Sequence, residues 1–348
     1  IAAAKKHVEA SYELGMIYNQ DQEVFANKQK AFSLFEVASN QNHPRATTEL
    51  GILYETGAGT KKDLQQAFKL YNKSSNLGEI NGIYHLGMCY LKGIGTNINC
   101  EKARSLFEKA SLADIADAKT QLGIMYQNEI GGPRDIFKAA KFFQEAANQG
   151  NTEAKVQLGH CYLDGKGVAM DYIKAFHLFK ETQKTDNVEG LFNLGLLYKK
   201  GIGPRKNINE AIEIFKNLIA RKNHVPSMFE LGSIYIKEME SEEQLRVAVD
   251  LLNSAVKGGN ADAMNLLGCC YLQGNGVDIN VDKAVYYFRE ASKAGNTLGK
   301  VNLAQCYIEG KGVPLDQEKG YKLLKEAPQD DPSAKFRIGV CLYKGAGV

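Results

Sequence analysis

Neither charge is in excess along this chain, and it contains no long apolar run. The 348 residues carry 43 Lys and Arg against 40 Asp and Glu, and the resulting charge of +3 is spread without a basic cluster. Nucleic-acid backbones are bound by clustered positive charge, so no nucleic-acid partner is expected. No stretch reaches the roughly 18 apolar residues that span a bilayer, and the first residues lack the zones of a signal peptide. We therefore expect no direct insertion of this segment into a membrane.

The residue patterns of metal sites and of common catalytic centres are also missing. The six histidines show no Cys-x-x-Cys, His-x3-His or His-Glu-x-x-His spacing, and zinc sites depend on such spacings to bring their ligands together. No Gly-x-Ser-x-Gly elbow or paired-carboxylate arrangement stands apart from the rest of the sequence. The sequence therefore predicts no catalytic residue, no metal, no cofactor and no enzyme activity.

What the sequence does contain is one motif repeated ten times. Leu-Gly-x-x-Tyr recurs with a spacing of 36 residues, apart from one spacing of 37 and one of 35. The copies begin at Leu14, Leu50, Leu86, Leu122, Leu158, Leu194, Leu231, Leu267, Leu303 and Ile338, and the last copy is degenerate. Such a period predicts a repeat architecture, in which units too small to fold alone share a core with their neighbours.

The first half of each unit predicts a helix, here called helix A. Ala46, Leu50 and Leu53 recur at helical spacing and form its buried stripe. A glycine inside a helix costs about 1 kcal/mol relative to alanine, so the glycine after the signature leucine implies a close approach by a neighbouring helix. A Gly-x-Gly pair, which begins at Gly57 in the second copy, then ends the helix in a left-handed conformation. Because these pairs follow helices, we interpret them as helix ends and not as phosphate-binding loops.

The second half predicts helix B. A capping residue stands four positions before the small residue that opens the second apolar stripe, and it is Asn or Asp in eight of nine copies. Asn and Asp side chains accept the free N–H groups at a helix start. The predicted caps are Asn27, Asp63, Asn99, Asp135, Asp171, Asn207, Gln244, Asn280 and Asp316. Helix B itself places one large side chain between small ones, as Ala103, Phe107 and Ala110 do.

The combined motif resembles the Sel-one-like repeat family, a relative of the tetratricopeptide repeats. It reads Ala-x3-Leu-Gly-x-x-Tyr, a Gly-x-Gly turn and Lys-Ala-x3-Phe-x-x-Ala, as in Lys102, Ala103, Phe107 and Ala110. The resemblance covers the whole chain. It implies an all-α fold, an α/α superhelix or solenoid of about ten tandem 36-residue helix-turn-helix repeats, tetratricopeptide-like, and we expect one such domain over residues 1–348.

Two copies depart from this pattern, and both ends of the sequence fall inside a repeat. The seventh copy lacks the glycine turn, so we expect a bend near 237–246, and the fourth copy has a displaced Gly131-Gly132-Pro133. Residues 1–5 occupy the position of the tail of a helix B, and Val348 stops inside a Gly-x-Gly turn. We therefore expect a fragment of a longer array whose exposed ends permit self-association.

Five of the seven cysteines share one position in the repeat, just before the signature tyrosine or its equivalent. They are Cys89, Cys161, Cys270, Cys306 and Cys341, where other copies have Ile, Leu or Met. We interpret them as small core residues, separated by about a helix pair and thus beyond the roughly 7 Å Cα distance of a disulfide. Cys100 and Cys269 fall elsewhere and could be exposed. A reducing compartment, and hence the cytoplasm, is favoured over the secretory pathway.

Two rows on helix A form the candidate binding site. The first row precedes the signature leucine and the second follows the signature glycine, so the two rows are neighbours three residues apart. In the central copies they are His85, Gln121, Gln157 and Asn193, and Met88, Ile124, His160 and Leu196. In related solenoids helix A lines the concave face, where these rows would form an apolar floor and an amide-bearing rim suited to a peptide. The alternative is that the second row packs between repeats and the first is merely solvated.

The resemblance implies binding rather than catalysis. The family includes adaptors of membrane-embedded ubiquitin ligases, activators of fungal cell-wall synthesis and bacterial effectors that engage host proteins. The leading hypothesis is a non-enzymatic scaffold or adaptor that binds protein or peptide partners on the concave helix-A surface, although the fold does not select the partner. The alternative is the β-lactam binding or hydrolysis attributed to cysteine-rich bacterial relatives. Their paired cysteines are absent, as is any nucleophile and base pair, which disfavours that activity.

Overall fold

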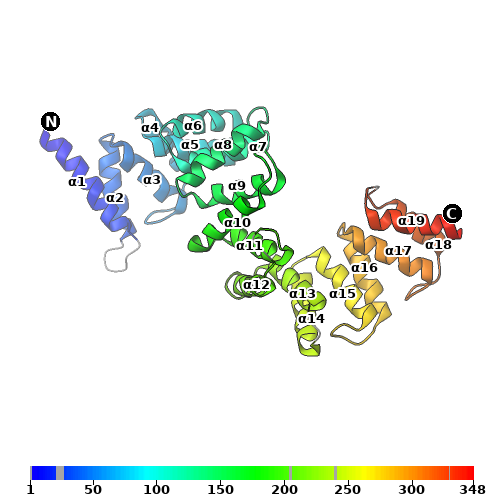
Figure 1. The fold of residues 1–348 in the computed structure, drawn as a ribbon. Helices are drawn as coiled ribbons and strands as arrows, with labels where there is room; N and C mark the ends of the chain where they lie inside the picture. Colours follow the sequence, from blue (N-terminus) through cyan, green and yellow to red (C-terminus); the bar gives the residue numbers. More distant parts are fainter. Residues whose placement is uncertain (1, 21–26, 204–205, 239–240, 329) are drawn as a thin grey trace. The chain divides into compact units, whose positions relative to one another are not determined.

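All the regular structure in the described residues is helical. The computed structural model describes residues 2–20, 27–203, 206–238, 241–328 and 330–348, and these ranges contain no strand (Figure 1). They hold nineteen α-helices and one short 3-10 helix, η1 (Thr182–Thr185). The predicted all-α repeat fold is therefore confirmed.

The odd-numbered helices are helices A and the even-numbered helices are helices B. The helices A are α1 (Ala2–Asn19), α3 (Pro44–Thr56), α5 (Ile80–Lys92), α7 (Ala116–Gln127), α9 (Thr152–Asp164), α11 (Val188–Lys200), α13 (Val225–Glu238), α15 (Ala261–Gln273), α17 (Thr297–Glu309) and α19 (Pro332–Lys344). The helices B are α2 (Lys28–Asn40), α4 (Leu64–Asn76), α6 (Cys100–Leu112), α8 (Ile136–Asn148), α10 (Tyr172–Glu181), α12 (Ile208–Lys222), α14 (Glu242–Lys257), α16 (Val281–Lys293) and α18 (Gln317–Lys325).

The turn between the two helices of a repeat is closed by three contacts, seen clearly in the third copy. Gly93 ends α5 in the left-handed conformation, at φ 72°. The Asn99 N–H donates to the Tyr90 carbonyl (2.8 Å), and the Asn99 side chain accepts from the Lys102 N–H (2.9 Å). The Lys102 ammonium lies 5.3 Å from the centre of the Tyr90 ring. The lysine of the motif therefore forms a cation–π contact with the signature tyrosine of its own repeat.

Eight of the nine predicted N-caps are confirmed, and Gln244 is wrong. Each of the eight Asn and Asp side chains accepts a backbone N–H in the first turn of its helix B. Helix α14 instead begins at Glu242, so Gln244 lies inside the first turn. Glu242 and Glu243 favour this early start because acidic side chains stabilise the positive N-terminal end of a helix.

The signature glycine lies against the large side chain of helix B. A Cβ added at Gly87 would lie 2.7 Å from Cε1 of Phe107, which is fully buried. In the ninth copy the glycine is on helix B instead: Ala304 stands at the signature position of helix A, and Gly320 faces it from helix B. A Cβ added at Gly320 would lie 2.8 Å from the Ala304 carbonyl oxygen. The predicted close approach is therefore the contact between helices A and B of one repeat.

The second glycine of the turn packs against the preceding repeat. A Cβ at Gly95 would collide with the carbonyl of Leu64, the first residue of α4, and one at Gly131 would collide in the same way with Cys100. Gly131 is thus in register, and the prediction that the fourth turn is displaced is wrong. What differs in this copy is Glu129, which occupies the position of the first glycine at φ 59°.

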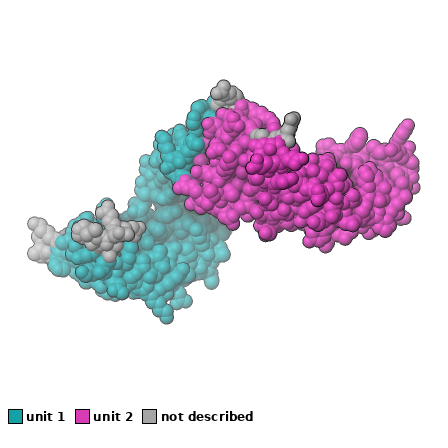
Figure 2. All heavy atoms as spheres, turned by 90° about the horizontal axis from the view of Figure 1, so that it is seen from below, with its two compact units in different colours: residues 1–187 teal, residues 188–348 magenta. Residues whose placement is uncertain are grey.

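The chain forms two compact units, residues 1–187 and 188–348 (Figure 2). Unit 1 contains α1 to α10 with η1, and unit 2 contains α11 to α19. Within each unit, consecutive helices A also contact one another, as α3 does with α5 and α15 with α17. The expectation of one continuous domain stays a prediction. The predicted bend near 237–246 includes residues 239 and 240, which lie outside the described residues.

The expectation that residues 1–5 end a separate helix B is wrong for the residues that are described. Helix α1 runs without a break from Ala2 to Asn19. In the next copy the helices are separated at Asn42, which adopts φ 61°, and Pro44. The equivalent residues of the first copy are Lys6 and Val8. Neither favours a left-handed turn or fixes a helix start, so the helix continues.

Candidate functional site

The helices A of the central repeats each present one stripe of exposed and half-buried residues. In α7 the stripe is Asp117, Gln121, Ile124 and Asn128, which lie on one side of the helix. The two outer residues are exposed and the two central ones are half-buried. The same order of exposure recurs in α5 and α9, so this face continues from one repeat to the next.

Six of the eight predicted site residues lie on this face of unit 1. They are His85 and Met88 on α5, Gln121 and Ile124 on α7, and Gln157 and His160 on α9. The other two, Asn193 and Leu196, belong to α11 of unit 2. The part of the candidate site contained in a single unit is therefore carried by α5, α7 and α9, which we call the inner helix-A surface.

The amide row contains two side chains with unused hydrogen-bonding groups. Within the described residues neither Gln121 nor Gln157 forms a side-chain hydrogen bond, although both are half-buried. No buried side-chain polar atom in that part of the chain lacks a partner, so both amides reach solvent. The Asn193 amide, by contrast, donates to the Glu189 carbonyl (2.8 Å). Gln121 and Gln157 can each offer two donors and an acceptor to a partner.

His85 opens the amide row as a neutral ring. It stacks on Tyr71, with ring centres 4.9 Å apart, and meets the edge of Tyr84 at 5.4 Å. Burial lowers the pKa of His85, and the carboxylates of Glu55 and Asp117 only partly oppose this effect. The imidazole is therefore mainly neutral near pH 7 and takes part in aromatic packing.

The apolar row is shared between the core and the surface. Met88 and Ile124 are half-buried and pack against the central core cluster of unit 1, and Leu196 does the same in unit 2. The His160 ring lies 5.4 Å from the Phe179 ring, roughly perpendicular to it. These side chains contribute to packing and still leave part of their surface exposed. The apolar row therefore combines packing between repeats with a partly exposed surface that a partner could contact.

A third row on the same face was missed. Asp117 and Glu153 stand four residues before Gln121 and Gln157, one helical turn away, and both are exposed. The Asp117 carboxylate accepts a hydrogen bond from the Asn151 amide (2.7 Å). The 36-residue period places these acids at equivalent positions in neighbouring repeats. The sequence pattern therefore contained a signal for this third row, although only the first two rows were predicted.

In unit 2, polar residues of the corresponding rows bond to side chains of the preceding repeat. The Lys199 ammonium donates to Glu230 (2.5 Å) and Ser233 (2.6 Å), and the Asn302 amide donates to Asn265 (2.8 Å). Here the polar groups of the rows connect neighbouring repeats. The unused amides of unit 1 are therefore not a general property of the repeat.

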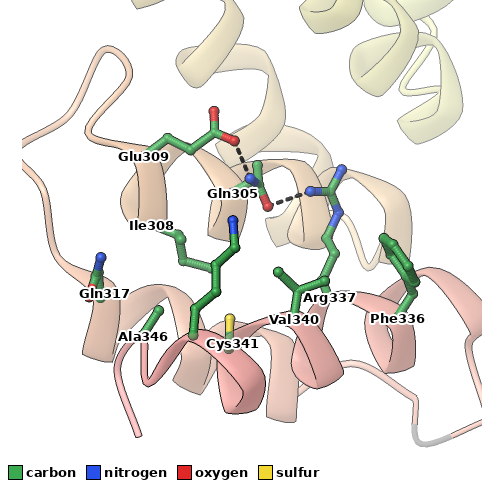
Figure 3. Close-up of a pocket in the computed structure, with 10 residues that line it drawn as sticks. Gln305, Ile308, Glu309, Gln317, Phe336, Arg337, Val340, Cys341 and Ala346 are labelled. Atoms are coloured by element: carbon green, nitrogen blue, oxygen red, sulfur yellow. Dashed lines mark hydrogen bonds between the residues drawn. The ribbon is translucent and has the colours of Figure 1, made fainter.

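A cavity of about 410 Å³ lies between α17 and α19 of unit 2 (Figure 3). The Arg337 guanidinium points toward Gln305, which in turn bonds Glu309. Ile308, Val340 and Cys341 supply its apolar wall. Gln305, Arg337 and Val340 belong to the same two rows of helix A, so in this last repeat the rows line a cavity.

The in-register cysteines are buried thiols. Burial raises the pKa of Cys89 and Cys270 to about 12 and that of Cys161 and Cys306 to about 11. A thiol with so high a pKa is a poor nucleophile at neutral pH, because the thiolate is the reactive form. Cys100 and Cys269 are half-buried.

The described residues contain no group of three or more His, Cys, Asp or Glu side chains placed to hold a metal ion. Among the helices described, none combines the length and the apolar character needed to cross a membrane.

Paired helices that share a core from repeat to repeat define this protein as a helical repeat solenoid. The sequence pattern of the Sel1 repeat matches residues 8–43, 44–79, 80–114, 116–151, 152–181, 188–219, 261–296, 298–327 and 332–348. The chain therefore belongs to the Sel1 repeat family, whose members are generally non-catalytic scaffolds for protein–protein interaction.

Solved structures show the same fold. A protective antigen of uropathogenic Escherichia coli, described as displaying an SLR fold, is similar over 99% of this chain and 81% of its own, with 23% identity and a TM-score of 0.65. A Sel1 repeat protein from Oxalobacter formigenes covers 86% of each chain, with 25% identity and a TM-score of 0.57. A signal-transduction ATPase with a tetratricopeptide repeat sensor, from Pyrococcus horikoshii, is similar over 98% of this chain and 60% of its own, with 17% identity and a TM-score of 0.51. No curated protein sequence matches the chain.

Proposed function

We propose that this chain is a non-enzymatic scaffold that binds a protein or peptide partner on helices A between Met88 and Leu196. The observation that carries the proposal is the pair of half-buried amides, Gln121 and Gln157, which make no hydrogen bond within the described residues. They stand beside the partly exposed side chains of Met88 and Ile124. Polar groups that fix orientation beside apolar area are what a peptide-binding surface needs.

The test is a triple substitution of the amide row. Gln121→Ala, Gln157→Ala and Asn193→Ala are combined, and the proteins captured by cross-linking in the source lysate are compared with those captured by the unaltered chain. A matched control replaces three exposed amides of helices B, at Gln65, Asn72 and Asn209. We expect the first variant to lose partners that the control retains, with helical circular dichroism unchanged. Equal capture by both variants would remove the proposal.

Self-association is a separate proposal, supported by apolar side chains on α19. Phe336 is 73% exposed and Tyr343 is 91% exposed, and exposed aromatic groups favour contact between molecules. Sizing chromatography over a range of concentrations tests it: an elution volume that does not change with concentration excludes self-association in that range.

A further inference from the structure

The cavity between α17 and α19 has a polar end, an apolar middle and a second polar end. Arg337, Val340 and Lys344 line it from α19, and they lie on one side of that helix, about one turn apart from one to the next. Gln305 and Ile308 line it from α17 with the same order of polar and apolar groups. The Arg337 guanidinium donates to the Gln305 side chain, so these two polar groups share one end of the cavity (Figure 3).

Three charged residues line this cavity, and only the acid among them has an ion-pair partner. Glu309 Oε2 lies 2.9 Å from Lys311 Nζ, and the same carboxylate accepts from the Gln305 amide. The hydrogen bonds from Lys311 and then from Gln305 lower the pKa of Glu309, and the charge of Arg337 adds a smaller effect. In the part of the chain that the structure describes, neither Arg337 nor Lys344 forms an ion pair. The lining therefore carries a net positive charge, and its two cations are available to a carboxylate.

The positive charge of Arg337 is held in a half-buried position. Among the described residues its side chain bonds only to the neutral amide of Gln305. Burial raises the pKa of Cys341 in the cavity wall, and the charge of Arg337 partly opposes this effect. A guanidinium has five N–H donors, so it can hold the Gln305 oxygen and still bind a carboxylate. Because partial burial reduces screening by salt, such a pair is favoured here over one in open solvent.

The spacing of the two cations selects the form of the ligand. Arg337 and Lys344 are seven residues apart on α19, which corresponds to about 10 Å along the helix axis. In an extended peptide, alternate residues share one face, and the first and fifth residues lie about 13 Å apart. The flexible stem of lysine accommodates the difference. The third residue of such a peptide then lies over Val340 and Ile308, where the cavity of about 410 Å³ has room for an apolar side chain.

We propose that this cavity binds an extended acidic peptide segment in which two carboxylate side chains flank an apolar one, as in Glu-x-Leu-x-Glu. One carboxylate binds Arg337, the other binds Lys344, and the apolar side chain packs on Val340. The site lies on α17 and α19, whereas the surface proposed above for a partner ends at Leu196. The cavity is therefore a second binding site with its own ligand chemistry.

The test measures the fluorescence anisotropy of short labelled peptides with the whole chain. Each peptide has an amidated C-terminus, which removes the terminal charge. The first contains Glu-x-Leu-x-Glu, the second Gln-x-Leu-x-Gln and the third Glu-x-Ser-x-Glu. We expect the first peptide to bind more tightly than either of the others, and its affinity to fall as ionic strength rises.

Two double variants assign this binding to the cavity. Arg337→Gln combined with Lys344→Gln removes both cations and is expected to weaken the first peptide about tenfold, since partly exposed ion pairs contribute modestly. Lys257→Gln combined with Lys322→Gln is the matched control. These two lysines of unit 2 are exposed, form no ion pair within the described residues and lie outside the cavity lining. The control loses the same charge and is expected to leave the affinity within about twofold, and circular dichroism checks the folding of both variants.

Three results would overturn the inference. They are equal binding of the first peptide and either of the others, absence of binding, and a cavity variant that behaves like the control. A fourth peptide, which ends at its leucine with a free carboxylate, tests the alternative source of the charge: if it alone binds, the cavity holds a chain end and the internal motif is rejected. The variant at Gln121, Gln157 and Asn193 contains no cavity residue and is expected to bind the first peptide normally, so this inference and the proposed function fail separately.

Discussion

Gly268 and Gly339 occupy the same motif position in two repeats of unit 2, and replacing each with alanine should have opposite effects. A Cβ at Gly268 would lie 2.6 Å from Cε1 of Phe288, well inside the 3.4 Å at which ordinary contact begins. Phe288 is 1% exposed, so its ring has little room to move. A Cβ at Gly339 would meet no described atom within 4 Å.

The expected magnitudes follow from two terms. Replacing a helical glycine with alanine stabilises the helix by about 1 kcal/mol, and this term applies to both sites. Overpacking a closed core costs about 1–3 kcal/mol, and this term applies only to Gly268. We therefore expect Gly268→Ala to destabilise the protein by up to about 2 kcal/mol and Gly339→Ala to stabilise it by about 1 kcal/mol.

Urea denaturation measures the stability change, and hydrogen exchange of α15, α16 and α19 assigns it to the altered repeat. The local measurement is needed because repeat arrays need not unfold in a single step. Phe288→Leu with Ala284→Gly should rescue Gly268→Ala, since the ninth copy combines Ala304 with Gly320 and Leu324. Effects of the same sign at both glycines, or no rescue, would refute the steric explanation.

Three further predictions concern single positions. Glu129→Gly should raise the free energy of unfolding by about 0.5–1 kcal/mol, because φ 59° is strained for glutamate; no gain in the urea midpoint would contradict this. Asp171→Ala should lower the free energy of unfolding by about 1 kcal/mol, since the Asp171 side chain accepts from the N–H groups of Ile173 (3.1 Å) and Lys174 (3.0 Å). Gln244→Ala, the control, should change the urea midpoint little. Burial lowers the pKa of His85 below 6.5, so as the pH falls below that value the unfolded chain takes up the proton first and stability is lost. His85→Phe should make stability between about pH 7 and pH 5 less dependent on pH, and an unchanged dependence in thermal melts would argue against a role for His85.

The positions of the candidate site residues on their helices could be predicted from the sequence, and their role in binding stays a prediction. The two rows follow from the period and from helical spacing, and the structure places six of the eight residues on one face of unit 1. The sequence could not show that the side-chain amides of Gln121 and Gln157 make no hydrogen bond within the described residues, whereas the Asn302 amide donates to Asn265. That difference depends on which side chains from neighbouring repeats come within about 3 Å.

The sequence alone predicted the repeat, its two helices, eight of the nine capping residues and the small and large positions of the core. It could do so because each of these is a local requirement, and ten copies of the motif separate a requirement from an accident of composition. Glycine at the end of helix A and Asn or Asp at the start of helix B satisfy backbone requirements of the helix ends themselves, whatever lies around them.

Which side chains contact one another depends on how the helices pack in three dimensions. The signature glycine could be assigned to a close approach from sequence, but Phe107 as the neighbour of Gly87, and Leu64 as the neighbour of Gly95, required coordinates. Contacts between residues distant in the chain depend on how repeats stack, and stacking is set by the sum of many packing contacts that no single motif encodes.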